Sequence, residues 1–215
     1  MFLSFKAAIF DMDGTIIDSL GIWEKIDYDF LEKKRGIKVP EDYVFKIAPM
    51  SFTETAIYTK ERFSLPETPE ELMREWTEMA IFEYSNNIFL KDGALEYIKN
   101  IKAEGKKVVL CTSSPNYLYE PVLKNNKIYD MFDAFANTCE AGVGKTSPDV
   151  YLLAAKKCGA EPNDCLCFED VIEAAACAKS AGMKVCGVYD DRSRNHKEQM
   201  KELCDIYIDS FKELL

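Results

Sequence analysis

The sequence of 215 residues lacks the features that mark several classes of protein. It contains one histidine, His196, and none of its eight cysteines stands in a Cys-x-x-Cys pair, which argues against a zinc site. No apolar run approaches the ~20 residues of a membrane-spanning helix. The stretch before residue 11 has no cationic leader and no small-residue cleavage site, so we expect no signal peptide.

Basic residues do not outnumber acidic residues in this sequence. The chain has 37 acidic and 27 basic residues and a formal net charge of −10. Because this charge repels nucleic acid and anionic lipid, we expect neither a nucleic acid nor a membrane as a partner, and a phosphorylated ligand would need nearby cations. Most of the cysteines lie in apolar runs, so we interpret them as reduced core residues of a cytoplasmic protein, and we expect a monomer by default.

Short apolar runs alternate with helical patterns along much of the chain. Strands are expected at 6–11, 106–112, 133–138, 165–170, 183–190 and 205–209. Helices are expected at 92–104, 116–125, 148–158 and 171–181. The apolar runs suit strands that are buried on both faces of a parallel sheet. The alternation therefore predicts an α/β fold with a doubly wound, Rossmann-like parallel sheet.

Residues 17–90 interrupt this alternation. They contain no convincing strand, whereas SFTE (51–54) and TPEE (68–71) are capping-box patterns typical of helix starts. A crossover between parallel strands needs only about a dozen residues, and this segment is much longer. We therefore predict an inserted α-helical cap domain at 17–90, with residues 1–16 and 91–215 forming the core domain.

Acidic residues occur where two of the predicted strands end. Asp11 and Asp13 follow the first strand, and their two-residue spacing places both carboxylates on one side of an extended backbone. Glu169 and Asp170 end the fourth strand. Ligands of parallel sheets bind at the carboxyl ends of the strands, so these groups are expected to meet. Four such carboxylates cannot all ionise without a cation, and oxygen ligands favour Mg²⁺.

Hydroxyl and ammonium groups are expected at the same edge of the sheet. Thr112 and Ser113 end the second strand, and Lys145 lies on a glycine-rich approach after the third. A metal ion and a lysine would form a pocket for a dianionic phosphate. One aspartate could then attack phosphorus while the other transfers the proton.

These segments resemble the four motifs of the haloacid dehalogenase superfamily. The matching stretches are DMDGT (11–15), CTSS (111–114), GVGKTSPDVYLLAAKKCG (142–159) and FED (168–170). They stand in the same order as in that family and cover essentially the whole chain. The helical insert is similar to the cap of subfamily I, which includes phosphoglycolate phosphatase and β-phosphoglucomutase.

The resemblance implies a role for each motif residue in phosphoryl transfer. Asp11 would be the nucleophile and form an aspartyl-phosphate, and Asp13 would be the general acid and base. Thr112 and Ser113 would bind the phosphoryl group, and Lys145 would bridge the charges of the nucleophile and the phosphate.

The resemblance also implies a Mg²⁺ site. Asp11, the backbone carbonyl of Asp13 and Asp170 would bind the ion, and Glu169 would either bind it directly or lie in its outer shell. The chain departs from the family pattern near this site. Val171 stands where many relatives have serine, and Ala174 stands where they have glycine or aspartate. Thr146 follows the lysine, where proline is usual.

The function we expect is a Mg²⁺-dependent phosphohydrolase of small phosphorylated metabolites, sugar phosphates or similar compounds. A phosphosugar mutase of the β-phosphoglucomutase type is the alternative, but it requires a cap cation. Phe52 occupies the position where an arginine is expected, with Lys46 nearby. A phosphorelay receiver also combines acidic residues, a threonine and a lysine at strand ends, but it is much shorter and has no comparable insert.

Overall fold

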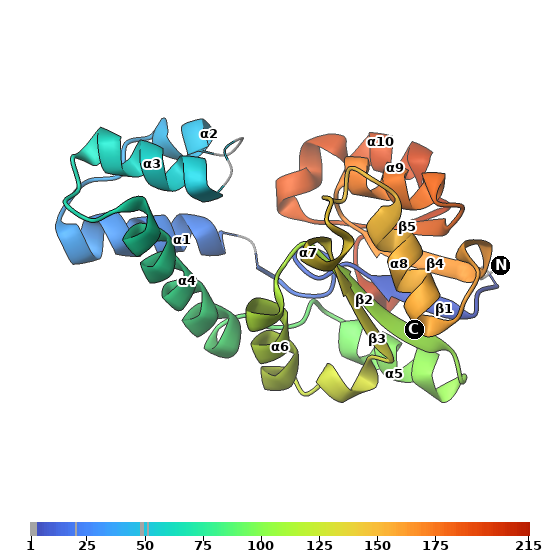
Figure 1. The fold of residues 1–215 in the computed structure, drawn as a ribbon. Helices are drawn as coiled ribbons and strands as arrows, with labels where there is room; N and C mark the ends of the chain where they lie inside the picture. The colour runs from blue at the N-terminus through green and yellow to red at the C-terminus, as the bar shows by residue number, and fades with distance from the viewer. Residues whose placement is uncertain (1–3, 20, 48–49, 51) are drawn as a thin grey trace. The chain divides into compact units, whose positions relative to one another are not determined.

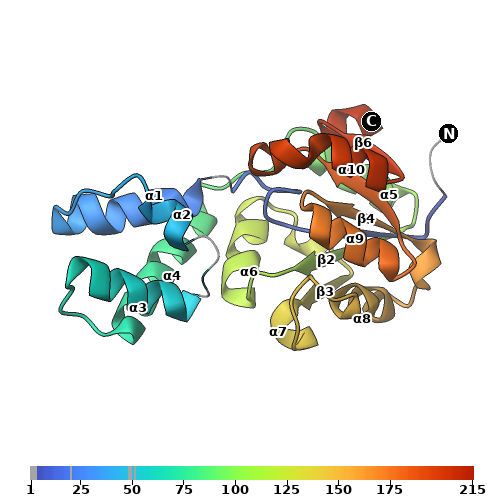
Figure 2. The same ribbon diagram turned by 90° about the horizontal axis from the view of Figure 1, so that it is seen from above.

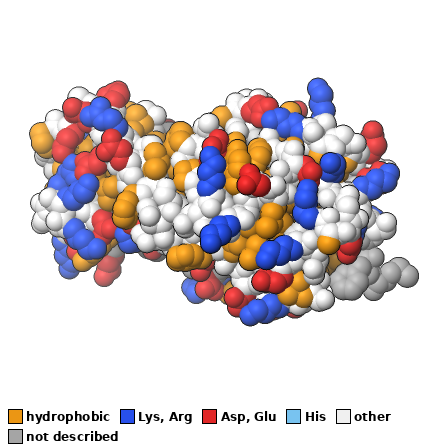
Figure 3. Space-filling model, turned by 90° about the horizontal axis from the view of Figure 1, so that it is seen from below, with side chains coloured by type: hydrophobic (Ala, Val, Ile, Leu, Met, Phe, Trp, Pro, Cys, Tyr) orange, Lys and Arg blue, Asp and Glu red, His pale blue; other side chains and the backbone are white. Residues whose placement is uncertain are grey.

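The computed structural model describes residues 4–19, 21–47, 50 and 52–215 of the chain. Contacts divide the chain into two compact units, Met1–Leu20 with Ile88–Leu215, and Gly21–Asn87. Among the described residues no helix is both long and apolar enough to cross a lipid bilayer. On the face shown in Figure 3, acidic and basic side chains are interspersed and do not gather into one patch of a single sign.

The first unit contains a six-stranded parallel sheet. Its strands are β1 (Ala7–Phe10), β2 (Lys107–Thr112), β3 (Ala134–Asn137), β4 (Cys165–Glu169), β5 (Lys184–Val188) and β6 (Ile206–Ile208). Their order is β3-β2-β1-β4-β5-β6, and every neighbouring pair is parallel. This is the strand order of a doubly wound Rossmann-like sheet, so the predicted fold class is confirmed.

Helices cover both faces of the sheet (Figure 1). They are α5 (Ala94–Ala103), α6 (Asn116–Asn125), α7 (Thr138–Ala141), α8 (Asp149–Cys158), α9 (Ile172–Ser180) and α10 (Lys197–Leu203). The helices α9 and α10 lie side by side in both views (Figure 2). The four helices expected in this unit, and all six strands, are observed to within two residues at each end.

Alternate residues of each strand build two apolar layers. On one face, Ile9 and Cys167 join a buried cluster with residues of α8, α9 and α10. On the other face, the rings of Phe10 and Phe168 stack with their centroids 4.5 Å apart and pack against Tyr97 of α5. The central strands are therefore buried on both sides, as the continuous apolar runs predict. All eight cysteines are free thiols, but Cys139 is exposed because it lies on the short surface helix α7.

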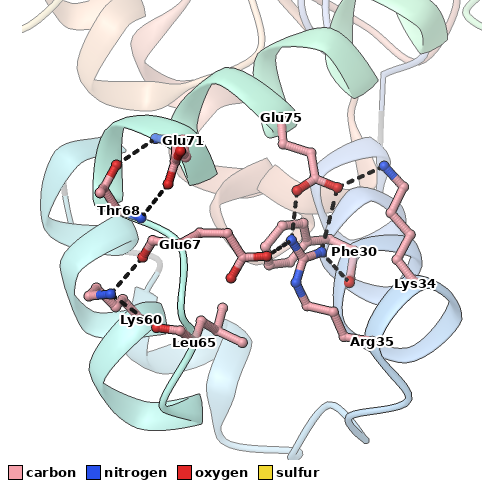
Figure 4. Close-up of polar contacts among 9 residues, drawn as sticks. All are labelled: Phe30, Lys34, Arg35, Lys60, Leu65, Glu67, Thr68, Glu71 and Glu75. Carbon is pink, nitrogen blue, oxygen red and sulfur yellow. Dashed lines mark hydrogen bonds and ion pairs between the residues drawn. The ribbon is translucent and has the colours of Figure 1, made fainter.

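The second unit is helical. It contains α1 (Ile22–Tyr28), a π-helix (Asp29–Lys33), α2 (Tyr43–Ile47), α3 (Phe52–Phe63) and α4 (Pro69–Asn86). Thr68 and Glu71 form the predicted capping box at the start of α4 (Figure 4). The capping box predicted at 51–54 begins at Ser51, which lies outside the described residues. The role of this unit as a cap domain, with boundaries at 17 and 90, stays a prediction.

A half-buried arginine, Arg35, links several elements of the helical unit. Arg35 donates hydrogen bonds to Glu67 at 2.6 Å and to Glu75 at 2.7 Å, and its guanidinium lies 3.7 Å from the ring centroid of Phe30 (Figure 4). Planar guanidinium groups suit such bonds to two carboxylates together with stacking on an aromatic ring. Arg35 thus links the segment after the π-helix to the loop just before α4 and to α4 itself.

Candidate active site

The candidate site lies where β1 and β4 end, at the point where the strand order reverses. The connections from β1 lead outward to β2 and β3, whereas those from β4 lead to β5 and β6 in the opposite direction. Asp11 directly follows β1, and its backbone N–H donates to the carbonyl of Phe168 at 3.0 Å. Glu169 ends β4, and Asp170 follows it. This reversal is the usual ligand site of doubly wound sheets, and the fold brings Asp11 together with Glu169 and Asp170 there.

Lys145 connects the two strand ends. Its Nζ atom donates to Asp11 Oδ1 at 2.5 Å and to Glu169 Oε1 at 2.6 Å. Burial disfavours the charged ammonium, but the attraction of Asp11 and Glu169 outweighs burial and holds the pKa of Lys145 well above its ordinary value. Lys145 is therefore a fixed cation beside Asp11 at neutral pH. It reaches this position from the segment between α7 and α8.

Glu169 is almost fully buried and has a second hydrogen-bond donor. The hydroxyl of Tyr151 donates to Glu169 Oε1 at 2.8 Å, the same oxygen that accepts from Lys145. Burial raises the pKa of Glu169 to about 7, although Lys145 attracts the charged form. Sequence reasoning missed Tyr151. Its place on the buried face of α8, six residues after Lys145, is the signal that could have identified it.

Asp170 packs directly against the turn that follows Asp13. The hydroxyl of Thr15 donates to Asp170 Oδ1 at 2.9 Å. Gly14 has φ +82°, and a Cβ atom there would lie 2.9 Å from Asp170 Cγ. Only glycine gives the carboxylate this close approach to the backbone. Burial, with repulsion from Asp11, raises the pKa of Asp170 well above its ordinary value.

Residues after β2 contact the second aspartate of the motif. Ser114 Oγ donates to Asp13 Oδ2 at 2.8 Å, and the Ser114 backbone N–H donates to Thr112 Oγ1 at 3.0 Å. Thr112 is buried and keeps its hydroxyl proton available for another acceptor, because its oxygen is the accepting atom in this bond. Ser113, in contrast, is exposed. The sequence predicted Thr112 and Ser113 at the end of the second strand and Asp13 after the first, but it did not single out Ser114 as a partner of Asp13.

Three of the predicted ligands form a group that suits a divalent cation. Asp11, Glu169 and Asp170 each offer a carboxylate oxygen, and these oxygens lie within 4.8 Å of one another. Buried carboxylates at such spacing repel one another, and an oxygen-only donor set is the kind that Mg²⁺ prefers. The donor set therefore fits the expected ion. The contribution of the Asp13 carbonyl stays a prediction.

The departures from the family pattern lie beside this group. Val171 is the N-cap of α9, is half exposed and makes no side-chain capping bond. Ala174 is buried one turn further on. Neither side chain can serve as an oxygen ligand or hydrogen-bond to one, so the surroundings of Asp170 depend on Thr15 and Gly14.

Solved structures share this fold over nearly the whole chain. CbbY from Rhodobacter sphaeroides, solved in complex with phosphate, is 23% identical with a TM-score of 0.79, and the match covers 98% of this chain and 96% of that chain. Among curated proteins, hexitol phosphatase B from Escherichia coli K12 is 28% identical over 97% of this chain and 93% of its own. The β-phosphoglucomutase of Bacillus subtilis is 30% identical over 85% of this chain and 83% of its own.

Both a hydrolase and a receiver domain can place an acidic group and a lysine at the strand ends of such a sheet, and the family comparison distinguishes them. The family model described as haloacid dehalogenase-like hydrolase matches residues 5–182. The chain therefore belongs to the haloacid dehalogenase-like hydrolases, as its four motifs indicated, and the interpretation as a receiver domain is set aside.

Proposed function

We propose that this protein is a Mg²⁺-dependent phosphatase of small phosphorylated metabolites that acts through an aspartyl-phosphate on Asp11. The observation that carries the proposal is the position of Lys145, 2.5 Å from Asp11 Oδ1 and 2.6 Å from Glu169 Oε1. A fixed cation at the nucleophile reduces the repulsion between a carboxylate and an incoming phosphate dianion.

The chemistry requires two displacements at phosphorus. In the first, an Asp11 oxygen bonds to phosphorus, the bond from phosphorus to the ester oxygen breaks, and Asp13 gives the leaving alcohol a proton. In the second, Asp13 takes a proton from water, the water oxygen bonds to phosphorus, and the bond to Asp11 breaks. The bond from Ser114 to Asp13 Oδ2 orients that carboxyl group. Thr112, Ser113 and Lys145 would hold the phosphoryl oxygens.

Asp11, Asp13 and Asp170 would hold the Mg²⁺ ion, with Glu169 either binding it or supporting the site from the outer shell. When bound, the ion would neutralise charge on the phosphoryl oxygens. Glu169 Oε1 already accepts hydrogen bonds from Lys145 and Tyr151, which favours the supporting role for this residue.

The proposed substrate class is that of sugar phosphates and similar phosphate monoesters. Its support comes from a relative, since hexitol phosphatase B matches almost the full length of the chain. The helical unit, Gly21–Asn87, is proposed to select the substrate and to exclude bulk water as a cap does.

A screen of phosphorylated metabolites with and without Mg²⁺ tests the proposal. The wild type should release inorganic phosphate only with Mg²⁺, and Asp11→Asn should lower kcat by roughly 10⁴-fold. The fold should persist, because Lys145 keeps Glu169 as a partner in that variant. Asp18→Asn, at an exposed aspartate of the same stretch, is the matched control and should retain activity. Full activity of Asp11→Asn would remove the nucleophile assignment.

Mutase activity is the second candidate because a β-phosphoglucomutase is 30% identical to this chain. That reaction must hold a second phosphate, which calls for a cation in the helical unit. Phe52, at the expected arginine position, instead packs its ring 5.7 Å from that of Trp76, while Lys46 on α2 is exposed. Incubation with β-glucose 1-phosphate separates the two activities. A phosphatase yields glucose and inorganic phosphate, whereas a mutase yields glucose 6-phosphate.

A further inference from the structure

Lys91 is a half-buried lysine that binds two other segments of the core unit. Its Nζ atom donates to the carbonyl of Gly14, to the carbonyl of Tyr189 at 2.7 Å and to Asp190 Oδ2 at 3.0 Å. These bonds use all three protons of the ammonium group. The backbone N–H of Lys91 also donates to the carbonyl of Ile16 at 2.9 Å. One residue thus holds the loop after β1 and the loop after β5.

The Gly14 peptide is fixed from two sides. Lys91 binds its carbonyl oxygen, while Asp170 lies against its Cα so closely that a Cβ there would be 2.9 Å from Asp170 Cγ. Asp13 precedes this glycine, and Thr15, which donates to Asp170, follows it. Any shift of the Gly14 carbonyl therefore moves the proposed general acid and changes the surroundings of Asp170.

We propose that Lys91 is a positioning residue of the phosphatase. Its ammonium holds the turn of residues 13–15 against Asp170. This contact fixes the positions of the acidic groups for phosphoryl transfer and for binding of the cation. This inference rests on the proposed function. Displacing a catalytic group by about 1 Å commonly costs on the order of 10²-fold in rate, so a single bond to a backbone carbonyl can control turnover.

A cavity beside Lys91 makes the proposal open to a direct test. It has a volume of about 400 Å³, and five of its eleven lining residues are aspartates. The acidic residues of its lining are Asp18, Asp92, Asp190, Asp191 and Asp209. Removing the lysine side chain would leave a negatively charged space next to the Gly14 carbonyl. A small organic ammonium ion can enter such a space and donate the missing hydrogen bonds.

The experiment compares Lys91→Ala with Lys212→Ala, using p-nitrophenyl phosphate as substrate. Lys212 is the matched control because it is exposed and pairs at 2.8 Å with Asp92, a residue of the same cavity lining. We expect Lys91→Ala to lower kcat by about 10- to 100-fold with little change in KM. Ethylammonium should restore kcat in a saturable manner in this variant, and it should change neither the wild type nor Lys212→Ala.

A second variant separates positioning from stability. Lys91→Ala leaves the buried Asp190 without its ammonium partner, which destabilises the fold. The double variant Lys91→Ala/Asp190→Asn removes that buried charge and keeps an oxygen to accept from the Arg192 backbone N–H, as Asp190 Oδ1 does. We expect its melting temperature to recover toward the wild-type value while kcat stays low. Recovery of kcat together with stability would overturn the positioning role.

The amide NMR signals of Gly14 and Thr15 in the metal-free protein give a readout that does not depend on turnover. They should shift in Lys91→Ala, return toward wild-type positions with ethylammonium, and stay unchanged in Lys212→Ala. Unchanged signals in Lys91→Ala would contradict the inference. If the wild type hydrolyses no phosphate ester but these signals respond as expected, the proposed function fails while the structural coupling stands.

Discussion

At the scale of single residues, Gly14 allows the Asp170 carboxylate to approach the backbone closely because it has no side chain. Its positive φ alone would strain any other residue, and the nearby Asp170 adds a second constraint. Gly105 offers a comparison, since its φ is +74° but nothing lies within 4 Å of the position of a Cβ atom. A side chain at either glycine would therefore strain the backbone, but only a side chain at Gly14 would also collide with Asp170.

We predict that Gly14→Ala and Gly105→Ala both lose about 1–2 kcal/mol of unfolding free energy, because each forces alanine into the left-handed region. Only Gly14→Ala should also lose most of its turnover, since its methyl group displaces Asp170. Chemical denaturation and phosphate-release assays on both variants check this. Equal activity of the two variants would show that close approach to Asp170 is dispensable.

Asp27 on α1 is a buried carboxyl group whose ionisation opposes folding. Burial, with a smaller contribution from Glu24, raises its pKa to about 7. The unfolded chain releases this proton near pH 4, whereas the folded protein keeps it up to about pH 7. The native state therefore binds more protons in this window, and stability is lost as pH rises through it, by at most ~1.4 kcal/mol per pH unit.

We predict that Asp27→Asn stabilises the protein by about 1–3 kcal/mol at pH 8 and by much less at pH 4, where the carboxyl group is neutral in the folded protein and only partly ionised in the unfolded chain. Urea titrations at several pH values measure this. Glu41→Gln, at an exposed position of the same unit, is the control and should show no such trend. A wild type whose stability rises from pH 4 to pH 7 relative to Asp27→Asn would contradict the assignment.

At the scale of secondary-structure elements, the start of α4 tests the contribution of local sequence. Thr68 accepts from the Glu71 backbone N–H at 3.2 Å, and Glu71 accepts from the Thr68 backbone N–H at 2.8 Å. We predict that Thr68→Ala costs about 1 kcal/mol of unfolding free energy. Thr77→Ala, which removes only a mid-helix hydroxyl bonded to Met73, should stay within about 0.5 kcal/mol. Equal losses would argue against the capping contribution.

Elements with local signals were predictable from the sequence, and elements that depend on distant partners were not. The capping box of Thr68 and Glu71 involves four consecutive residues, so its pattern is visible directly. The π-helix of Asp29–Lys33 has no such pattern, because its wider turn arises inside an otherwise ordinary helical run. Tyr151 and Lys91 escaped notice for a similar reason, since each acts through bonds to residues 18 or more positions away in the chain.

At the scale of the whole molecule, the site brings together segments spread over most of the chain. Asp11 and Asp170 meet because β1 and β4 are neighbours in the sheet. Their positions after predicted strands were sufficient to predict this meeting, since the carboxyl ends of parallel strands share one edge of the sheet. The sequence could not predict the exposed ring of Phe52 packed near Trp76, or the bonds that fix the Gly14 carbonyl. Under the proposed function, substrate choice would depend on such side-chain arrangements, so the substrate must be measured.

The most direct test of the account is a search for a phosphoryl group on Asp11. Asp13→Asn should slow the second displacement more than the first, because the substrate p-nitrophenyl phosphate needs little help from an acid to leave. Acid quenching during turnover, followed by mass spectrometry, should then find a phosphorylated peptide containing Asp11 in the wild type and more of it in Asp13→Asn. Steady hydrolysis with no phosphoryl group on Asp11, and undiminished turnover in Asp11→Asn, would contradict the account.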